Sequence, residues 1–392
     1  MLVTEAISAD LSVAKISTAA GVDEIALDWD RLAGDVPFRR REWLETWWRH
    51  YLQPGMELFI VALRDADGEL VGLAPWHLKR SALSGRVLCF LGSGEVCSDY
   101  LTVLAAPGQE QLVARRLADW LGDEARELWD LIELDGIELG DPLVHAMSEE
   151  LAAQGCVVHR RERLGAWRLE LPADWKSYLA RLSKSRRGGV RTLEKRHFET
   201  GRAMLRTAQS GIEVARGLAI LHELHQRRRA SLGDAGCFAS PRFARFLAEA
   251  AERFHELGQL RLQWLELDGR PVAAEFDLNS ADTIYHYQSG IDPDAMQDKP
   301  GWLVQIGALR TAIEEGFRWF DFLRGDEPYK SWWRAERRSL FEVRIVARRR
   351  SARLRHRVWI AGVHTKTWLR EIAAWARRRW AKNRGRNDAA AD

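Results

Sequence analysis

The sequence predicts an α/β fold in which mixed sheets are covered by helices. Short apolar runs alternate with longer amphipathic segments along nearly the whole chain, a pattern typical of strands and helices that share a core. The order strand, two helices, meander, helix and strand occurs twice, once before residue 174 and once after residue 201. The 392 residues suffice for two such units.

In the first unit, each strand is predicted by a short apolar run and each helix by apolar residues three or four positions apart. A hairpin is expected around Asp67-Gly68, because Asp-Gly favours tight turns. The expected helices span residues 23–32, 41–51, 109–121 and 142–154. The expected strands span residues 11–17, 58–63, 70–74, 86–91, 100–104, 129–134, 156–159 and 167–171.

A basic helix is predicted over residues 174–200, interrupted at Gly188-Gly189. The second unit then repeats the first, with a hairpin around Asp268-Gly269. Its expected helices span residues 213–231, 241–257 and 303–315, and its expected strands span residues 203–208, 260–267, 272–278, 283–289, 317–323 and 340–346. The predicted domains are therefore residues 1–173, a connecting helix at 174–201, residues 202–346 and a basic, Trp-rich helical tail at 347–392.

The distribution of charge and the cysteine content indicate which cellular compartment and which partners to expect. From residue 347 to 392 there are 14 Lys and Arg against three Asp and Glu, whereas the rest of the chain has 45 against 53. A mildly acidic body with a basic tail results. The four cysteines lack metal-ligand spacing, which favours a reducing compartment without a disulfide framework. No signal peptide and no membrane-spanning run is expected, so the sequence predicts a cytoplasmic protein.

Residues 317–333, FRWFDFLRGDEPYKSWW, are the stretch richest in candidate catalytic side chains. Aromatic residues predict a strand that breaks at Arg324-Gly325. Four polar residues follow within the next five positions: Asp326, Glu327, Tyr329 and Lys330. A packed strand that ends in such a turn is a common way to present chemistry, although a solvated turn would look similar.

Just upstream, residues 292–302 join a strand to a helix that starts at Pro300-Gly301. The unpaired amides and the dipole of a helix start favour an anion. Gly301 permits close approach of a phosphate, and Lys299 adds a positive charge.

This order of meander, anion-binding loop, helix, strand and polar turn resembles the core of GNAT acetyltransferases. More closely, the chain resembles the CelD-type acetyltransferases of cellulose biosynthesis, distant relatives of the Fem peptidoglycan aminoacyltransferases. The matching residues are the strand HYQSG at 286–290, the Pro300-Gly301 loop, DFLRGDEPYK at 321–330, and Trp333. The resemblance implies two GNAT-like halves in tandem. The loop has one glycine where the usual acyl-CoA signature has more.

The activity implied is acyl transfer from acetyl-CoA or another acyl-CoA to an amine or hydroxyl. The CoA diphosphate would bind at Gly301 and Trp302, with Lys299 and Pro300 shaping the loop. A general base is needed for the acceptor, for which Asp326 and His286 are candidates. Tyr329 would protonate the leaving thiolate. Three further assignments are open. Lys330 or Arg324 would contact an anionic group or the oxyanion. Asp321 is either catalytic or an ion-pair partner of Arg324, and His286 is either a base or a core histidine.

The resemblance also implies a role in assembly of a cell-surface polysaccharide such as cellulose or another exopolysaccharide, with a small-molecule or glycan acceptor. Two alternatives stay open: a Fem-like transferase that uses aminoacyl-tRNA, and a non-catalytic scaffold of a polysaccharide-synthesis complex. Tryptophans beside arginines in residues 347–392 suit peripheral contact with the inner membrane face. Nucleic-acid binding is not expected, because the body is acidic, and no metal is expected, because His222 and His225 lack a third ligand.

Overall fold

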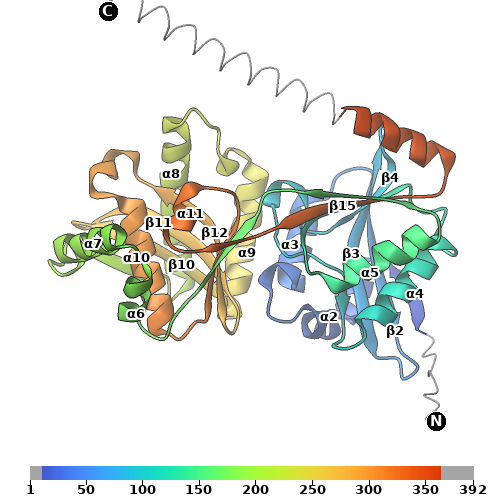
Figure 1. The fold of residues 1–392 in the computed structure, drawn as a ribbon, viewed down its shortest axis with the longest axis horizontal. Coiled ribbons are helices and arrows are strands. Elements are labelled where there is room, and N and C mark those ends of the chain that lie inside the picture. The colour runs from blue at the N-terminus through green and yellow to red at the C-terminus, as the bar shows by residue number, and fades with distance from the viewer. Residues whose placement is uncertain (1–10, 363–392) are drawn as a thin grey trace, which may run out of the picture.

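The chain folds into two mixed sheets that lie side by side along the length of the molecule (Figure 1). The structure is a computed structural model and describes residues 11–362. The first sheet has eight strands, in the order β1-β2-β3-β4-β6-β15-β7 with β5 paired to β3. The second has seven, in the order β14-β8-β13-β12-β11-β10-β9. The predicted α/β fold with two mixed sheets is confirmed.

The strands of the first sheet are β1 (Ser12–Ile16), β2 (Met56–Arg64), β3 (Leu70–Ser81), β4 (Gly85–Phe90), β5 (Leu104–Ala105), β6 (Leu131–Glu138), β7 (Val157–Glu162) and β15 (Leu340–Val346). Those of the second sheet are β8 (Ala166–Glu170), β9 (Ala203–Thr207), β10 (Leu260–Leu267), β11 (Arg270–Asn279), β12 (Thr283–Ile291), β13 (Trp319–Arg324) and β14 (Glu336–Arg338).

The two sheets repeat one topology. Each has an antiparallel meander of four strands, β1 to β4 or β9 to β12, followed by one parallel pair, β4–β6 or β12–β13. Two further antiparallel strands complete each sheet. This shared order supports the internal repeat that the sequence indicates.

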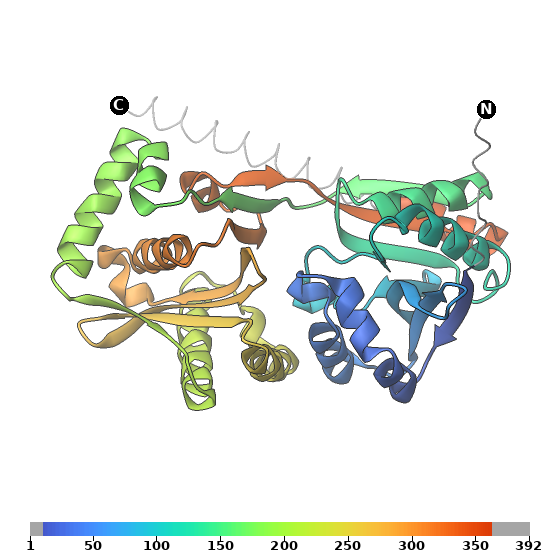
Figure 2. The same cartoon turned by 90° about the horizontal axis from the view of Figure 1, so that it is seen from below.

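The sheets exchange one strand each. β15, near the end of the described chain, lies between β6 and β7 in the first sheet, and β8 lies between β13 and β14 in the second. The β7–β8 segment runs antiparallel to the β14–β15 segment, and the two cross together from one half to the other (Figures 1 and 2). Each of the expected units, residues 1–173 and 202–346, therefore contributes one strand to the sheet of the other, and the division into domains stays a prediction.

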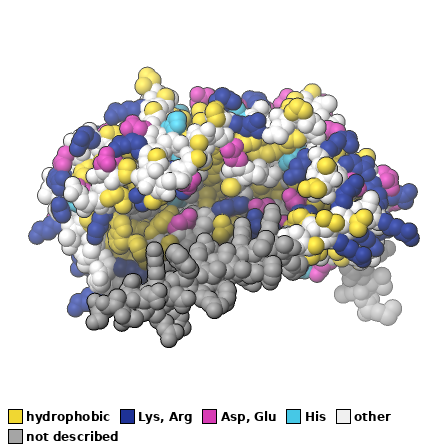
Figure 3. Space-filling view, turned by 90° about the horizontal axis from the view of Figure 1, so that it is seen from above, with side chains coloured by type: hydrophobic (Ala, Val, Ile, Leu, Met, Phe, Trp, Pro, Cys, Tyr) yellow, Lys and Arg dark blue, Asp and Glu magenta, His cyan; other side chains and the backbone are white. Residues whose placement is uncertain are grey.

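Helices cover both faces of each sheet (Figure 2). In the second sheet, α8 and α9 lie on one face and α10 on the other. Seen from above, the middle of the molecule is hollowed and hydrophobic side chains gather there (Figure 3).

The labelled helices are α1 (Ala19–Glu24), α2 (Ala26–Ala33), α3 (Arg41–Tyr51), α4 (Glu110–Gly122), α5 (Pro142–Ala153), α6 (Trp175–Arg181), α7 (Lys184–Leu193), α8 (Gly211–Ser231), α9 (Pro241–Glu256), α10 (Pro300–Glu314) and α11 (Pro328–Trp332).

Three expectations about the elements are wrong in detail. The basic connecting segment breaks at Leu182-Ser183, where Ser183 caps α7, and not at Gly188-Gly189, which lie inside α7. The strand expected at residues 100–104 shortens to β5. The turn after β13 folds into the short helix α11.

In the tail, residues 350–362 are helical, and the Trp359 ring stacks on His356 and contacts Arg344 of β15. Trp368, Trp375 and Trp380, on which the membrane expectation also rests, lie outside the described residues.

The halves meet through a packed aromatic seam between α3 and α9. The Trp43 ring centroid lies 4.9 Å from that of Phe246 in an edge-to-face contact, and Trp43 is fully buried. Tyr287 of β12 donates a hydrogen bond to the carbonyl of Val96 at 2.7 Å. His50 of α3 also contacts Glu249 of α9 at 2.8 Å. Because these side chains are closely packed between the halves, the two halves form one packed unit.

Candidate active site

The candidate site lies where β12 and β13 diverge. These parallel strands pair only from Thr283–Trp319 to Tyr285–Asp321, although β12 continues to Ile291. A bulge in β12 leaves Tyr287 without a partner on β11. A gap therefore opens at the carboxyl ends of the parallel pair, which is the usual location of ligand sites in such sheets.

A cavity of about 370 Å³ occupies this gap. His286 and Gly290 of β12, Gly301 and Trp302 of α10, and Tyr329 of α11 line it. Residues from the end of α8 also line it, so the cavity is bordered by helices from both faces of the sheet. The structure thus brings together four of the predicted site residues: His286, Gly301, Trp302 and Tyr329.

The start of α10 is open toward this cavity. Among the described residues no side chain caps the helix, and its N-cap, Lys299, lies in the left-handed region with φ of 57°. A Cβ atom built on Gly301 would first meet the Ile291 side chain at 3.7 Å. The positive end of the helix dipole thus borders the cavity and is suited to an anion. Pro300 is buried at the first helical position, and neither Pro300 nor Lys299 lines the cavity.

A buried polar cluster stands on the α10 side of the sheet. His286 Nδ1 lies 2.8 Å from Asp277 Oδ1, and Glu275 Oε2 lies 4.0 Å from the same nitrogen. Burial raises the pKa of Glu275 to about 7. Burial alone would lower the pKa of His286, but the carboxylates of Glu275 and Asp277 outweigh it and raise that pKa. Because Nδ1 contacts Asp277, Nε2 of His286 is the nitrogen available for proton exchange with a ligand.

Tyr329 and Lys330 take different positions in the turn after β13. Tyr329 lines the cavity, and burial, followed by the charge of Glu327, raises the pKa of its phenol, which is therefore protonated at neutral pH. The buried Lys330 ammonium instead donates to the carbonyls of Leu323, Arg324 and Gly325, at 3.1, 2.9 and 3.1 Å. Leu323 has a positive φ of 54°, rare for a branched residue, and Lys330 helps to hold it.

Asp321, Arg324 and Asp326 do not line the cavity. Asp321 is fully buried and pairs with Arg168 at 2.8 Å, not with Arg324, and it also accepts a hydrogen bond from Tyr100 at 2.6 Å. Arg324 contacts Asp99 and Asp135 of the first half. Asp326 accepts from Trp167 Nε1 at 3.2 Å at the surface. In the described structure these three residues tie the second half to other segments.

Sequence reasoning missed several residues that line the cavity or support it. Glu275 and Asp277 lie on β11, within an otherwise mostly apolar run. They are two positions apart, the spacing that places both side chains on one face of a strand. His225 and Arg228 come from the end of α8. The run of three arginines at 227–229 was the available signal for that end of the cavity.

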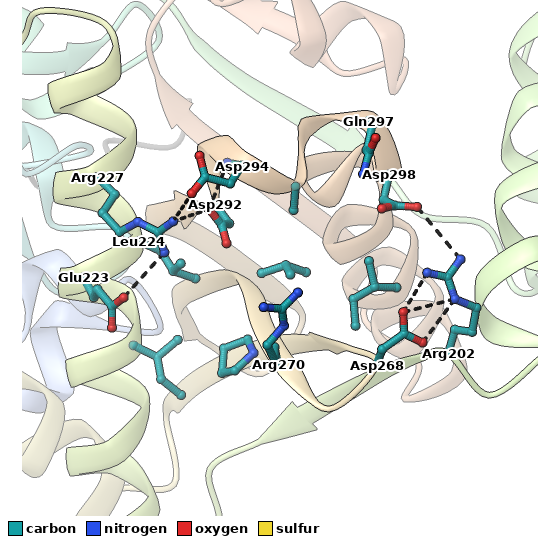
Figure 4. A pocket seen from close by; sticks show the side chains of 15 residues that line it. Arg202, Glu223, Leu224, Arg227, Asp268, Arg270, Asp292, Asp294, Gln297 and Asp298 are labelled. Atoms are coloured by element: carbon teal, nitrogen blue, oxygen red, sulfur yellow. Dashed lines mark hydrogen bonds and ion pairs between the residues drawn. The ribbon is translucent and has the colours of Figure 1, made fainter.

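A larger cavity of about 550 Å³ lies on the other side of residues 293–298 (Figure 4). Its charges largely pair with one another. Arg227 contacts Asp292 and Asp294 at 2.7 and 2.8 Å, and Arg202 contacts Asp268 at 2.7 Å. It also lies away from His286 and Tyr329, so it is a poorer candidate for acyl transfer.

The family comparison agrees with the position of this cavity. Residues 184–331 match the acetyltransferase (GNAT) domain family. The matched GNAT region spans α7 to α11 and includes every residue of the cluster around His286. No curated protein matches the chain by sequence. The expected GNAT-type domain is thus confirmed, whereas the CelD type stays a prediction.

Solved structures resemble most of the chain. FemX matches with a TM-score of 0.58 and 14% identity, covering 84% of this chain and 96% of its own. A conserved protein of unknown function from Bacteroides thetaiotaomicron matches with a TM-score of 0.55 and 12% identity, covering 86% and 100%. The C-terminal domain of a putative lysylphosphatidylglycerol synthetase from Agrobacterium fabrum matches with a TM-score of 0.50 and 10% identity, covering 86% and 95%. At these identities the likeness concerns the fold alone.

Proposed function

We propose that this protein is a GNAT-type acyltransferase that moves an acetyl or longer acyl group from acyl-CoA to an amine or hydroxyl acceptor. One observation carries the proposal: the open start of α10, the His286–Asp277 pair and Tyr329 border a single cavity in the gap between β12 and β13. An anion site, a base and a phenol around one cavity are the groups that thioester chemistry requires.

The reaction follows from these positions. The thioester lies in the gap, with the CoA diphosphate at Gly301 and Trp302. His286 Nε2 accepts a proton from the acceptor as its nitrogen or oxygen attacks the thioester carbonyl and the new bond forms. The C–S bond then breaks, and Tyr329 donates its proton to the departing thiolate. Tyr329 is afterwards reprotonated from solvent and His286 releases its proton, so the site is restored.

The other predicted residues receive supporting roles in this proposal. Lys330 fixes the turn that carries Tyr329, because its ammonium binds three consecutive carbonyls. Asp321 and Arg324 hold that turn against the first half. We assign the base to His286 in preference to Asp326, since Asp326 bonds Trp167 and Arg337 at the surface.

Calorimetry with acetyl-CoA and longer acyl-CoAs tests the donor. We expect binding to the wild-type chain and at least tenfold weaker binding to a Gly301→Val variant, whose side chain would enter the diphosphate position. Turnover on a panel of amines and alcohols tests the reaction. Absence of both binding and turnover would favour a non-catalytic scaffold.

For the cellular role, we propose assembly of a cell-surface polysaccharide such as cellulose or another exopolysaccharide, on the cytoplasmic side of the inner membrane. The support is the resemblance of residues 321–330 to CelD-type acetyltransferases. A glycan or sugar acceptor follows from that role. Acetylation of amino sugars and oligosaccharides by the purified chain is the measurement, and exclusive acylation of non-sugar amines would contradict it.

We also propose peripheral membrane contact through residues 347–392. None of the helices in the described part of the chain has the length and apolar content that crossing a bilayer requires. In the helix at 350–362, Leu354 and Val358 are 64% and 63% exposed on one face, beside exposed Arg350 and Arg357. Lys and Arg also gather at the same end of the molecule (Figure 3).

Flotation with anionic vesicles tests this contact. A Leu354→Glu/Val358→Glu variant should float less with the vesicles than the wild type. Equal flotation would remove the proposal.

A Fem-like transferase that uses aminoacyl-tRNA is the second candidate. Its support is the basic surface of α7 and of the helical turn that follows it, where the exposed cations Lys184, Arg191 and Lys195 have no ion pair among the described residues. Arg186 of α7 also donates to the carbonyl of Trp332 beside the cavity. Binding of charged tRNA with a steep salt dependence, together with no acyl-CoA binding, would favour this candidate.

A further inference from the structure

The end of α8 supplies three consecutive arginines, and two of them have partners. Arg227 pairs with Asp292 at 2.7 Å, and Arg229 pairs with Asp234 at 3.1 Å. Arg228 is half-buried and lines the cavity, and its guanidinium has no hydrogen bond or ion pair among residues 11–362. A guanidinium that is partly removed from water is stabilised most by binding a carboxylate or a phosphate, because the oxygens of these groups match its planar N–H donors.

Arg228 also lies across the sheet from the open helix start. α8 packs on one face of the second sheet and α10 on the other (Figure 2). The contact between α8 and β12 is close, because a Cβ atom on Gly290 would lie 2.5 Å from the backbone nitrogen of His225. Where β12 and β13 separate, the cavity is lined by residues from both faces of the sheet. It therefore offers one anion position at Gly301 of α10 and a second at Arg228 of α8.

We propose that Arg228 binds an anionic group, a carboxylate or a phosphate, on the acceptor. This inference rests on the proposed acyl transfer, in which the donor diphosphate takes the position at Gly301. The acceptor then enters from the α8 side, with its nucleophile at His286 and its anionic group at Arg228. The enzyme is therefore selective for acidic acceptors, such as phosphorylated amino sugars or amino acids.

Binding of inorganic phosphate and of acetate to the CoA-saturated chain tests the site without knowledge of the acceptor. CoA fills the donor position, so the remaining anion binding reports on Arg228. We expect Arg228→Gln to weaken this binding at least tenfold, and Arg228→Lys to restore part of it. Arg245→Gln is the matched control, since Arg245 is exposed on α9 and outside the cavity, and it should bind as the wild type does.

Kinetics with paired acceptors gives the second readout. Glucosamine 6-phosphate is compared with glucosamine, and an amino acid with its amide. The wild type should prefer the anionic member about tenfold or more, and Arg228→Gln should lose that preference through a higher KM, with acetyl-CoA affinity unchanged. Equal phosphate binding by Arg228→Gln and wild type would overturn the inference. So would a parallel loss of acetyl-CoA affinity, which would place Arg228 at the donor.

The two proposals can fail separately. If the chain binds no acyl-CoA, the proposed function fails, and phosphate titration of the free chain still decides whether Arg228 holds an anion. If acyl-CoA binds and neutral acceptors are used as well as acidic ones, the function stands and the Arg228 inference fails.

Discussion

His286 is the residue on which the proposed chemistry depends most. Its Nδ1 contacts Asp277, which orients the ring and favours the protonated imidazole. We expect His286→Gln to lower kcat by about 100-fold or more while the affinity for acetyl-CoA is retained. Asp277→Asn should lower kcat less and shift the acidic limb of the pH–rate profile, which reports the deprotonation of the base, to lower pH, because the imidazole loses a nearby negative charge. A full kcat in His286→Gln would exclude this residue as the base.

Glu275 gives the fold a pH dependence that can be measured apart from activity. Its pKa is raised by burial to about 7 in the folded chain, against an ordinary value of 4.5. The folded state thus holds the proton more tightly, so this stabilisation is complete below about pH 4.5 and is lost as the pH rises through 7. The raised pKa of His286 acts in the same direction.

Urea unfolding at pH 5.5 and 8.5 measures this effect. The wild type should lose about 2 kcal/mol of stability between the two pH values, and Glu275→Gln should lose less. Glu57→Gln, on an exposed part of β2, is the control and should keep the wild-type dependence. A wild type that is equally stable at both pH values would contradict the raised pKa.

At the scale of elements, two glycines set how the helices border the gap. Gly290 of β12 lies so close to α8 that a Cβ atom would clash with the backbone of His225. We expect Gly290→Ala to lower the free energy of unfolding by about 1–3 kcal/mol, because backbone cannot yield as a side chain can. Thermal or urea unfolding measures this loss.

Gly301→Ala provides the contrast. Its Cβ atom would meet only Ile291 side-chain atoms at 3.7 and 4.0 Å, so the fold should be as stable as the wild type. Affinity for acyl-CoA should nonetheless fall, since the added methyl group stands at the helix start. Unchanged stability of Gly290→Ala, or a destabilised Gly301→Ala, would reverse this assignment of roles.

At the scale of the whole molecule, the half-buried Arg324 links the two halves. Arg324 contacts the buried Asp99 and the carboxylate of Asp135, and its backbone N–H donates to Asp99 at 2.7 Å. Arg324→Ala leaves Asp99 without its main partner and should cost about 3–5 kcal/mol. Arg337→Ala, which breaks a surface pair with Glu162, should cost under about 1 kcal/mol. Equal urea midpoints for the two variants would contradict this account.

The exchanged strands make each half depend on the other. A fragment of residues 1–173 lacks β15 from its own sheet and carries β8 without its partners, and a fragment of residues 174–392 has the opposite defect. Unpaired strand edges favour aggregation. Each fragment alone should therefore be poorly soluble, whereas co-expression should give a soluble complex by size-exclusion chromatography. Two fragments that are soluble and folded separately would contradict the exchange.

The sequence alone determined the element types, the repeated order and part of the site. Periodicity and turn chemistry act over a few residues, so the Asp-Gly hairpins, the amphipathic helices and the helix start at Pro300-Gly301 were readable without coordinates. The proximity of His286, Gly301 and Tyr329 followed from a family resemblance, not from periodicity.

Only the tertiary structure decided which residues meet across long separations. The exchange of β8 and β15 leaves no local trace, because either sheet satisfies the same strand pattern. For the same reason Asp321 pairs with Arg168 and not with its neighbour Arg324, and Glu275 acquires its raised pKa from burial that no spacing reveals. Local sequence therefore specifies segments, while long-range packing specifies the polar contacts that a site needs.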